Sequence, residues 1–360
     1  MKDEEIWQDM KSAFKKLLEY FIPQRIALQL GSRNTCLIDE DSNIDHLQTI
    51  VFEEGELHSG KYLRVGSLQI HTEVESRFLW PICRREVCNV EVSSFFFKDI
   101  FSRRFRFKPL HIYSSVSPDT TEVDFRGLVD AVLSCKQVKK ASFIFEPIAA
   151  AIGMGLDIEK ESYILDIGHT SSIFSVISDN RVRNAHAIYS PCLSDDLLYE
   201  LKRVMMENNI RVSEAMLGRI PWVIKDEDKY TVHGTNSVTA LPMQFTITRK
   251  QVIACYSPMI MNIIDKVKDF MKEKNLLFSA ESPLYLIGGG SYLVGIAEIF
   301  AEQGINVVIP EDSDEVIAKG LHKIAMNKCG YPIDREKVVF REVKSYKKVR
   351  NARRLLPLYD

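Results

Sequence analysis

The sequence predicts an α/β protein with two related lobes that face one ligand. Two stretches, residues 26–38 and 163–177, each contain two apolar strands joined by a short turn rich in glycine and hydroxyl groups. A third buried strand, over residues 283–287, ends in three consecutive glycines. Three such turns indicate a cleft in which the backbone closely approaches a bound molecule.

The composition is that of a globular protein. The chain has 360 residues, of which 46% are hydrophobic and 27% charged, enough for one large domain or two of ordinary size. The net charge of −2 gives no global attraction to nucleic acid, so no such partner is expected. Seven scattered cysteines lack the paired spacing of a zinc site, which favours reduced core residues and a cytosolic compartment. No apolar run approaches the roughly 18 residues of a membrane span, and the N-terminus is too charged for a secretory signal.

Residues 4–22 are predicted to form an amphipathic helix that ends before Pro23. Apolar side chains, Trp7 and Phe14 among them, recur at steps of three and four residues, with lysines on the other side. Two interpretations stay open. The helix either packs on the protein's own surface or lies in a membrane interface, although four acidic residues near its start weaken the second interpretation.

The first lobe continues with a glycine-interrupted segment, residues 45–90, which predicts a small insert. Phenylalanines over 95–101 are expected on a helix that faces the core. Phe105 and Phe107 lie among basic residues and are harder to bury. The elements expected next are a strand over 109–116, a helix over 121–133, a strand over 141–145 and an alanine-rich helix from Pro147.

Two acidic residues stand at strand ends. Glu146 lies between a strand and a helix, where a carboxylate can be a cap or a catalytic group. Asp166 ends the strand before Gly168, His169 and three hydroxyl residues. That turn can present N–H and hydroxyl groups to a phosphate while Asp166 holds a metal ion or water. The alternative is an ordinary hairpin with a polar tip.

The remaining chain is predicted to be mostly helical. Expected elements are helices over 194–207, 210–217, 249–274, 292–300 and 313–326, with extended chain over 230–248. The end, residues 344–360, carries six basic residues within 344–354. It is interpreted as a solvated tail or as a contact for an anionic or protein partner.

These segments together resemble the actin-like ATPases, and within them the bacterial MreB family. The best-matched segments are residues 145–156, the turn at 163–177 and residues 288–320, and the likeness spans roughly residues 26–328. The resemblance implies an actin-like, ribonuclease H-like fold in which each lobe has a mixed sheet, flanking helices and a smaller insert. The implied divisions are 1–23 for the N-terminal helix, 24–160 and 314–340 for lobe I (insert 45–90), 161–313 for lobe II (insert 198–248) and 341–360 for the basic tail.

The resemblance also implies an ATP/ADP site with Mg²⁺. The first phosphate loop would comprise Gly31, Ser32, Asn34 and Thr35, and the second Asp166, Gly168, His169, Thr170, Ser171 and Ser172. Gly288, Gly289 and Gly290 would face the adenosine. Glu146 would orient the attacking water, and Asp166 would hold the metal. Phe105 and Phe107 fall near the family's membrane-inserting loop, and the helix with Trp7 and Phe14 resembles its N-terminal membrane helix.

Several positions depart from the family pattern. Gln29 replaces an aspartate that helps hold hydrated magnesium. Only Gly168 remains of three glycines in the second loop. Pro221 and Val223 fall where a lysine and a glutamate would contact the nucleoside. Arg33 is large and charged for a phosphate turn, and it either contacts phosphate or blocks it. His169 is either a gap-filling surface residue or a phosphate donor whose charge depends on pH.

The favoured function is a filament-forming, membrane-associated MreB-like protein in cell shape or cell-wall organisation, with weakened ATP turnover. It would lie at the cytoplasmic face of the membrane, and its partners would be itself, the membrane surface, an intact actin-like homologue or cell-wall synthesis proteins. The alternative is a non-hydrolysing scaffold or regulatory subunit that acts through partner binding. A sugar or acid kinase is disfavoured, since no large insert is available to form a substrate pocket.

Overall fold

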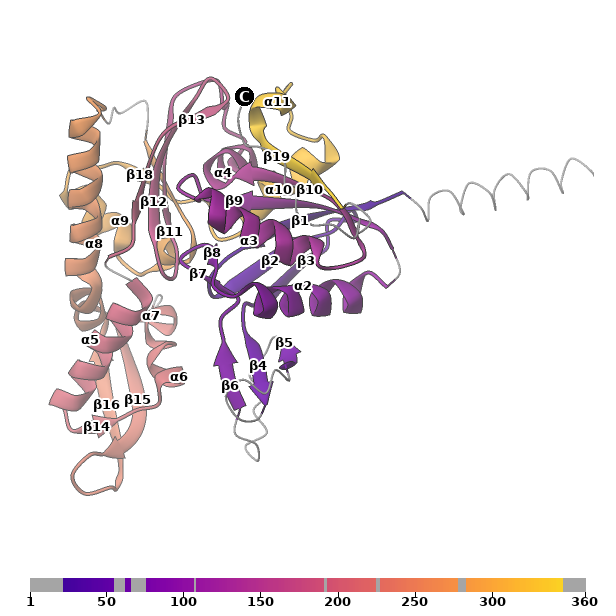
Figure 1. Ribbon diagram of the computed structural model, residues 1–360. Coiled ribbons are helices and arrows are strands. Elements are labelled where there is room, and N and C mark those ends of the chain that lie inside the picture. Colours follow the sequence, from indigo (N-terminus) through magenta and orange to yellow (C-terminus); the bar gives the residue numbers. More distant parts are fainter. Residues whose placement is uncertain are drawn as a thin grey trace, which may run out of the picture.

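The computed structural model describes residues 22–54, 62–65, 76–106, 108–190, 193–224, 227–277 and 283–345. The predictions for Trp7, Phe14, Phe107 and the chain beyond residue 345 lie outside these ranges. The described chain forms two lobes, each built on its own sheet (Figure 1).

Lobe I contains a six-stranded sheet in the order β19-β10-β9-β1-β2-β3. β1 pairs in parallel with β9 and antiparallel with β2. The strands are β1 (Gln24–Leu30), β2 (Asn34–Ile38), β3 (Ile44–Gln48), β9 (Leu110–Val116), β10 (Val138–Phe145) and β19 (Val339–Lys344).

Helices cover both faces of this sheet because successive side chains of its central strands are buried on opposite sides. Ile26 and Leu28 belong to one core cluster, and Ala27 between them belongs to another. α2 (Val90–Arg104) and α3 (Glu122–Leu133) cover the first face. α4 (Glu146–Met154) and α10 (Val316–Met326) cover the second, and the short α11 (Arg335–Val338) precedes β19.

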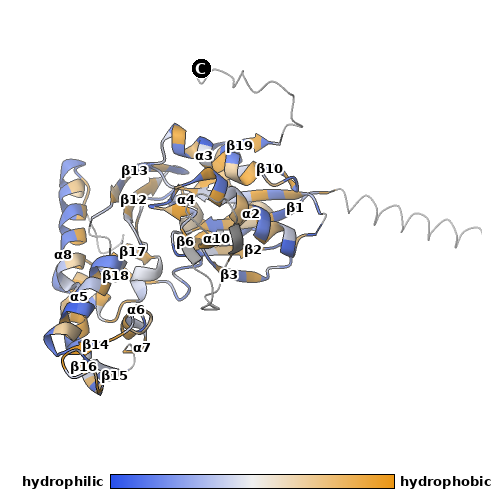
Figure 2. Ribbon diagram, turned by 60° about the horizontal axis from the view of Figure 1, so that its bottom comes forward, coloured by the Kyte–Doolittle hydropathy of each residue, from blue (hydrophilic) through white to orange (hydrophobic). Residues whose placement is uncertain are grey.

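Lobe II contains a five-stranded sheet in the order β13-β12-β11-β17-β18. Its strands are β11 (Ser162–Ile167), β12 (Ser172–Ser178), β13 (Arg181–Ile188), β17 (Leu284–Ile287) and β18 (Val307–Val308). α5 (Leu193–Glu207), α8 (Arg249–Glu273) and α9 (Ile296–Glu302) pack with this sheet in one core cluster. Hydrophobic and hydrophilic residues alternate along α8, which buries one side and exposes the other (Figure 2).

Each lobe carries a smaller sheet. In lobe II this is β14 (Ile210–Arg211), β15 (Lys229–Asn236) and β16 (Pro242–Thr248), beside α6 (Glu214–Leu217) and α7 (Ile220–Val223). In lobe I it is β4 (Val51–Glu54), β5 (Tyr62–Val65) and β6 (Ser76–Leu79). The hairpin β7 (Ile82–Cys83) and β8 (Glu86–Val87) follows. The expected insert began at residue 45, but β3 pairs with β2 in the main sheet, so the smaller sheet begins only after Gln48.

α4 and α10 pack unusually closely behind the lobe I sheet. A Cβ on Gly153 would lie 1.9 Å from the carbonyl oxygen of Val316. A Cβ on Gly320 would lie 1.7 Å from the carbonyl oxygen of Ala149. Only glycine permits this backbone contact, which fixes α4, and with it Glu146, against α10.

Three expectations about single elements were wrong. The helix expected over 292–300 is broken, because Gly295 has a φ of +77° between the 3₁₀ turn η1 (Gly289–Tyr292) and α9. The helix expected over 210–217 starts only at α6, after the short β14. Residues 341–344, expected in the tail, instead belong to β19, which pairs antiparallel with β10.

Phe105 is also placed differently from the membrane-loop hypothesis. Its side chain is 7% exposed and packs in the lobe I core. It ends α2 at the C-cap, where the 3.6-residue period of the helix points it inward with Phe101. Within the described ranges, no helix combines the length and apolarity needed to cross a bilayer.

Candidate functional site

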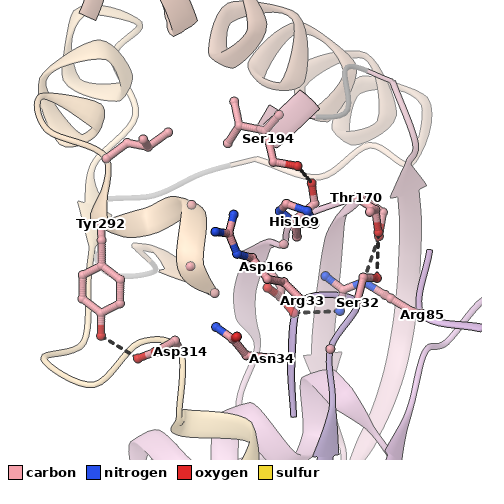
Figure 3. A pocket seen from close by; sticks show the side chains of 18 of the residues that line it. Ser32, Arg33, Asn34, Arg85, Asp166, His169, Thr170, Ser194, Tyr292 and Asp314 are labelled. Carbon is pink, nitrogen blue, oxygen red and sulfur yellow. Dashed lines mark hydrogen bonds and ion pairs between the residues drawn. The ribbon is translucent and has the colours of Figure 1, made fainter. Parts of the chain in front are cut away.

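A cavity of about 440 Å³ lies between the two lobes (Figure 3). Its floor consists of the turns that follow β1, β11 and β17, and its wall comes from α5 and α7. The predicted site residues that line it are Gly31, Ser32, Asn34, Glu146, Asp166, Gly168, His169, Thr170, Ser171, Gly288, Gly289 and Gly290. Thr35 and Ser172 are absent from the lining, and Thr35 instead shares a buried 2.9 Å hydrogen bond with Thr49.

The glycines serve different purposes in these turns. A Cβ on Gly288, which has a φ of +82°, would lie 2.2 Å from Oδ1 of Asp166. A Cβ on Gly290 would lie 2.3 Å from Cγ2 of Ile167. Both glycines are therefore required for packing against β11. A Cβ on Gly289 would meet nothing within 4 Å, so this position alone leaves open space beside the backbone.

The two predicted phosphate loops contact each other directly. The hydroxyl groups of Ser32 and Thr170 are 2.8 Å apart and share a hydrogen bond. The backbone N–H of Arg84 also donates to Thr170 Oγ1 at 3.1 Å. These bonds join lobe I to lobe II across the floor of the cavity.

Arg85 provides a second and more deeply buried connection, and sequence reasoning missed it. Its Nη1 donates to Oδ2 of Asp166 at 2.8 Å and to Oε2 of Glu146, while its Nε donates to Ser171 Oγ at 3.1 Å. The side chain is 10% exposed. It also packs against Gly168, where a Cβ would lie 3.0 Å from Nη2. Arg85 thus links Glu146 of lobe I with Asp166 of lobe II.

The hairpin that carries Arg85 has an uncommon turn. Cys83 pairs with Glu86, which leaves Arg84 and Arg85 as its two central residues. Both have positive φ, 47° and 68°. Such turns favour Asn-Gly or Asp-Gly, and side chains with a Cβ are strained there. The arginines lack this turn signature, so no local motif marked the hairpin; the one signal was an Arg-Arg pair between short apolar runs.

The electrostatics keep Arg85 charged. Burial opposes its charge, but Asp166 and then Glu146 raise its pKa above the ordinary value. Burial raises the pKa of the Glu146 carboxyl, and Arg85 opposes this shift. One guanidinium therefore serves two carboxylates that are themselves nearly buried.

These residues do not fit the Mg²⁺ expected at Asp166. The Asp166 carboxylate is engaged by Arg85. Gln29 is engaged at both ends of its amide, since Nε2 donates to the Asp314 carbonyl at 3.1 Å and Oε1 accepts from the Ala318 N–H at 3.0 Å. Among the described residues, no group of three or more His, Cys, Asp or Glu side chains could hold a metal ion. Glu146 is likewise occupied rather than free to orient water.

His169 is neutral at physiological pH. Burial, and to a lesser extent the nearby Arg33, lower its pKa to about 4, while Asp195 opposes this shift. Its backbone carbonyl accepts a 2.7 Å hydrogen bond from Ser194. The idea of a phosphate donor that titrates near neutrality therefore does not fit this environment.

The opposite wall of the cavity is apolar. Leu193, Leu197, Leu198 and Leu201 from α5 face it together with Pro221 and Trp222 of α7. Trp222 is 47% exposed. The resemblance places Pro221 where family members have a charged residue that contacts the nucleoside. In this chain the Pro221 ring and the indole of Trp222 line the cavity there.

Two α/β lobes, each with a smaller sheet, that meet at a cleft floored by three glycine turns define an actin-like protein. The family model described as MreB/Mbl protein matches residues 82–330. The chain belongs to this MreB/Mbl family.

Individual relatives agree with this assignment. The cell shape-determining protein MreB of Haemophilus influenzae is 23% identical over 337 residues, which cover 85% of this chain and 94% of that protein. MreB5 of Spiroplasma citri bound to AMPPNP has a TM-score of 0.72 at 17% identity, covering 85% of this chain and 98% of that one. The MamK double helical filament has a TM-score of 0.68 at 13% identity, covering 84% and 99%. These structures share its fold.

Proposed function

We propose that this chain is a cytoskeletal member of the MreB family that assembles into filaments, alone or with an intact homologue, and does not hydrolyse ATP. Family membership and the likeness to a MamK filament support assembly. The absence of hydrolysis makes it the scaffold or regulatory type of subunit rather than an ATP-driven one. A metabolic kinase has no support from these relatives.

The observation that carries this proposal is the position of Arg85. Hydrolysis in this fold would need one carboxylate to support the metal and another to orient water. Arg85 lies between Glu146 and Asp166 and forms an ion pair with each of their carboxylates. Moving it aside would leave buried charges unpaired, which costs about 3 to 5 kcal/mol. The resting arrangement of the site therefore opposes the chemistry.

The same contacts suggest what the site does instead. Arg85 and the Ser32–Thr170 hydrogen bond connect the lobes through the protein's own side chains. A subunit held closed by its own side chains presents one surface to its neighbours at all times, which suits a permanent scaffold. We further propose that residues 4–22 hold the filament at the cytoplasmic face of the membrane, where it contributes to cell shape or cell-wall organisation by recruiting cell-wall synthesis proteins.

Sedimentation and phosphate release on the purified full chain test this proposal. We expect pelleted polymer with no nucleotide, with ADP and with ATP plus Mg²⁺, alone or when mixed with an intact homologue. Phosphate release should stay at background in each condition. ATP-dependent assembly accompanied by phosphate release that Glu146→Gln abolishes would contradict the proposal. A chain that never pellets under any of these conditions would contradict its filament part.

A further inference from the structure

The buried and the exposed ends of the cavity carry opposite charges. At the buried end, Arg85 contributes one positive charge against the two carboxylates of Glu146 and Asp166. Arg33 lies on the exposed side and extends into the cavity (Figure 3). Among the described residues, no carboxylate is within ion-pair distance of the Arg33 guanidinium. Arg33 would therefore attract an anion that enters the cavity, and the carboxylates of Glu146 and Asp166 would repel an anion that moves deeper.

Side chains of the protein itself occupy part of the polar end of the cavity. Contact between Ser32 and Thr170 closes the gap between the two loops, and Arg85 fills the space behind it. The cavity, about 440 Å³, is lined by Arg33, Glu146 and Asp166 as well as by the apolar wall at Trp222. This volume lies within the ordinary range for small-ligand sites.

We infer that this cavity binds a nucleoside with a single phosphate and does so without a divalent cation. The phosphate contacts Arg33, with Asn34 beside it, and the base packs against Trp222 and the leucines of α5. The inference rests on the proposed function, since both require Arg85 to stay between the two carboxylates.

Charge and shape together favour this ligand class. A guanidinium binds one phosphate through paired N–H groups and needs no metal to do so. A longer phosphate chain would extend toward Glu146 and Asp166. Arg85 offsets only one of these two negative charges, so the carboxylates would repel the added phosphates. A planar base can stack on the half-exposed indole of Trp222, a contact that is strong for any base.

Calorimetric titration of the full chain with AMP, ADP and ATP, each in EDTA and in Mg²⁺, tests the inference. We expect AMP to bind about tenfold more tightly than ATP, with EDTA changing the AMP affinity less than about twofold, because no metal takes part. Arg33→Gln should weaken AMP about tenfold or more, and Trp222→Ala several-fold.

Two matched variants control for general effects. Arg126→Gln removes an exposed arginine of α3, and Trp80→Ala removes a tryptophan that is 44% exposed; neither side chain lines the cavity. Both should bind AMP like the unmodified chain. Equal melting temperatures for all four variants exclude loss of folding as the cause.

Each contrary outcome has a distinct meaning. Tighter binding of ATP with Mg²⁺ than of AMP overturns the inference, as does AMP binding that Arg33→Gln leaves unchanged. Failure of every nucleotide to bind at millimolar concentration overturns it and leaves the non-hydrolysing filament intact. Mg²⁺-dependent ATP binding with phosphate release overturns both.

Discussion

At the scale of single residues, Arg85 decides what this site can do. The acid at the end of a strand and the acid at the start of a helix were identifiable from the sequence as candidate catalytic groups. Whether these two carboxylates are free or paired could not be identified from the sequence, because Arg85, which pairs with both, lies 61 residues before Glu146 and 81 residues before Asp166. A guanidinium supplied by the chain itself converts two candidate catalytic carboxylates into a structural ion cluster.

Replacement of Arg85 should destabilise the protein in a pH-dependent way. Arg85→Gln leaves Glu146 buried next to Asp166 with no counter-charge, and we expect a loss of about 3 to 5 kcal/mol in unfolding free energy at pH 7.5. Burial already raises the pKa of Glu146 in the folded state, and the loss of Arg85 removes the group that opposes this shift. A folded pKa above the unfolded one means that the folded variant binds the proton more tightly, so its deficit should shrink as pH falls from 7.5 to 5.

Urea unfolding at both pH values measures this effect. The double variant Arg85→Gln/Glu146→Gln removes the titrating carboxyl, so it should recover part of the loss at pH 7.5 and show a smaller change with pH. Arg126→Gln on the exposed side of α3 is the control and should match the unmodified chain. A deficit of Arg85→Gln that is equal at pH 7.5 and pH 5 would argue against an unpaired Glu146 as its cause.

At the scale of elements, the contact between α4 and α10 positions the start of α4 at the cavity. The two helices approach closely enough that glycine is required at both Gly153 and Gly320. A third helical glycine, Gly127 in α3, differs, since a Cβ there would find its nearest neighbour at 3.7 Å. Replacing glycine by alanine should therefore lower the stability of the protein at Gly320 but not at Gly127.

Gly320→Ala should destabilise the protein by about 3 kcal/mol or more, because the new Cβ must displace the backbone of α4. Gly127→Ala should be neutral or stabilise it by about 0.5 to 1 kcal/mol, since alanine loses less backbone entropy in a helix. Thermal and urea unfolding of the two variants would measure both effects. Similar stabilities for the two variants would show that α4 and α10 are packed less closely than described.

At the scale of the whole molecule, the lobes are joined at the cleft floor by the protein's own side chains. Ser32 and Thr170 make one connection, and Arg85 makes the other through Asp166. In a protein whose cleft closes on a ligand, the ligand supplies the difference in energy between open and closed states. Here the protein's own side chains already link the lobes, so we expect the overall shape to respond little to ATP or Mg²⁺.

Small-angle X-ray scattering from the monomeric protein tests this expectation. Profiles of the unmodified chain with EDTA, with Mg²⁺ and with ATP plus Mg²⁺ should superimpose, because the closed state is present throughout. Arg85→Gln should increase the radius of gyration in EDTA, and Arg126→Gln should not. An unmodified chain that becomes more compact only on addition of ATP and Mg²⁺ would contradict the closed resting state.

Much of the fold could be predicted from local pattern. The strands before Gly31 and Gly168, the helices after Glu146 and Thr248, and the strand ending at Gly288 were located from apolar runs and their flanking turn residues. The errors arose where tertiary pairing or a single backbone angle overrides local pattern. β3 and β19 depend on partners in the main sheet, and the break before α9 depends on the positive φ of Gly295.

The sequence by itself determined that two strand–turn–strand units and a triple-glycine turn face one cleft, because apolar periodicity and glycine placement are local properties of the chain. It also located the residues of the three turns. Only the tertiary structure decided that the cleft floor is occupied by Arg85, because that contact joins residues from both lobes. Burial of Phe105 was decided there too, since a phenylalanine among arginines faces the core only once the helix orientation is fixed.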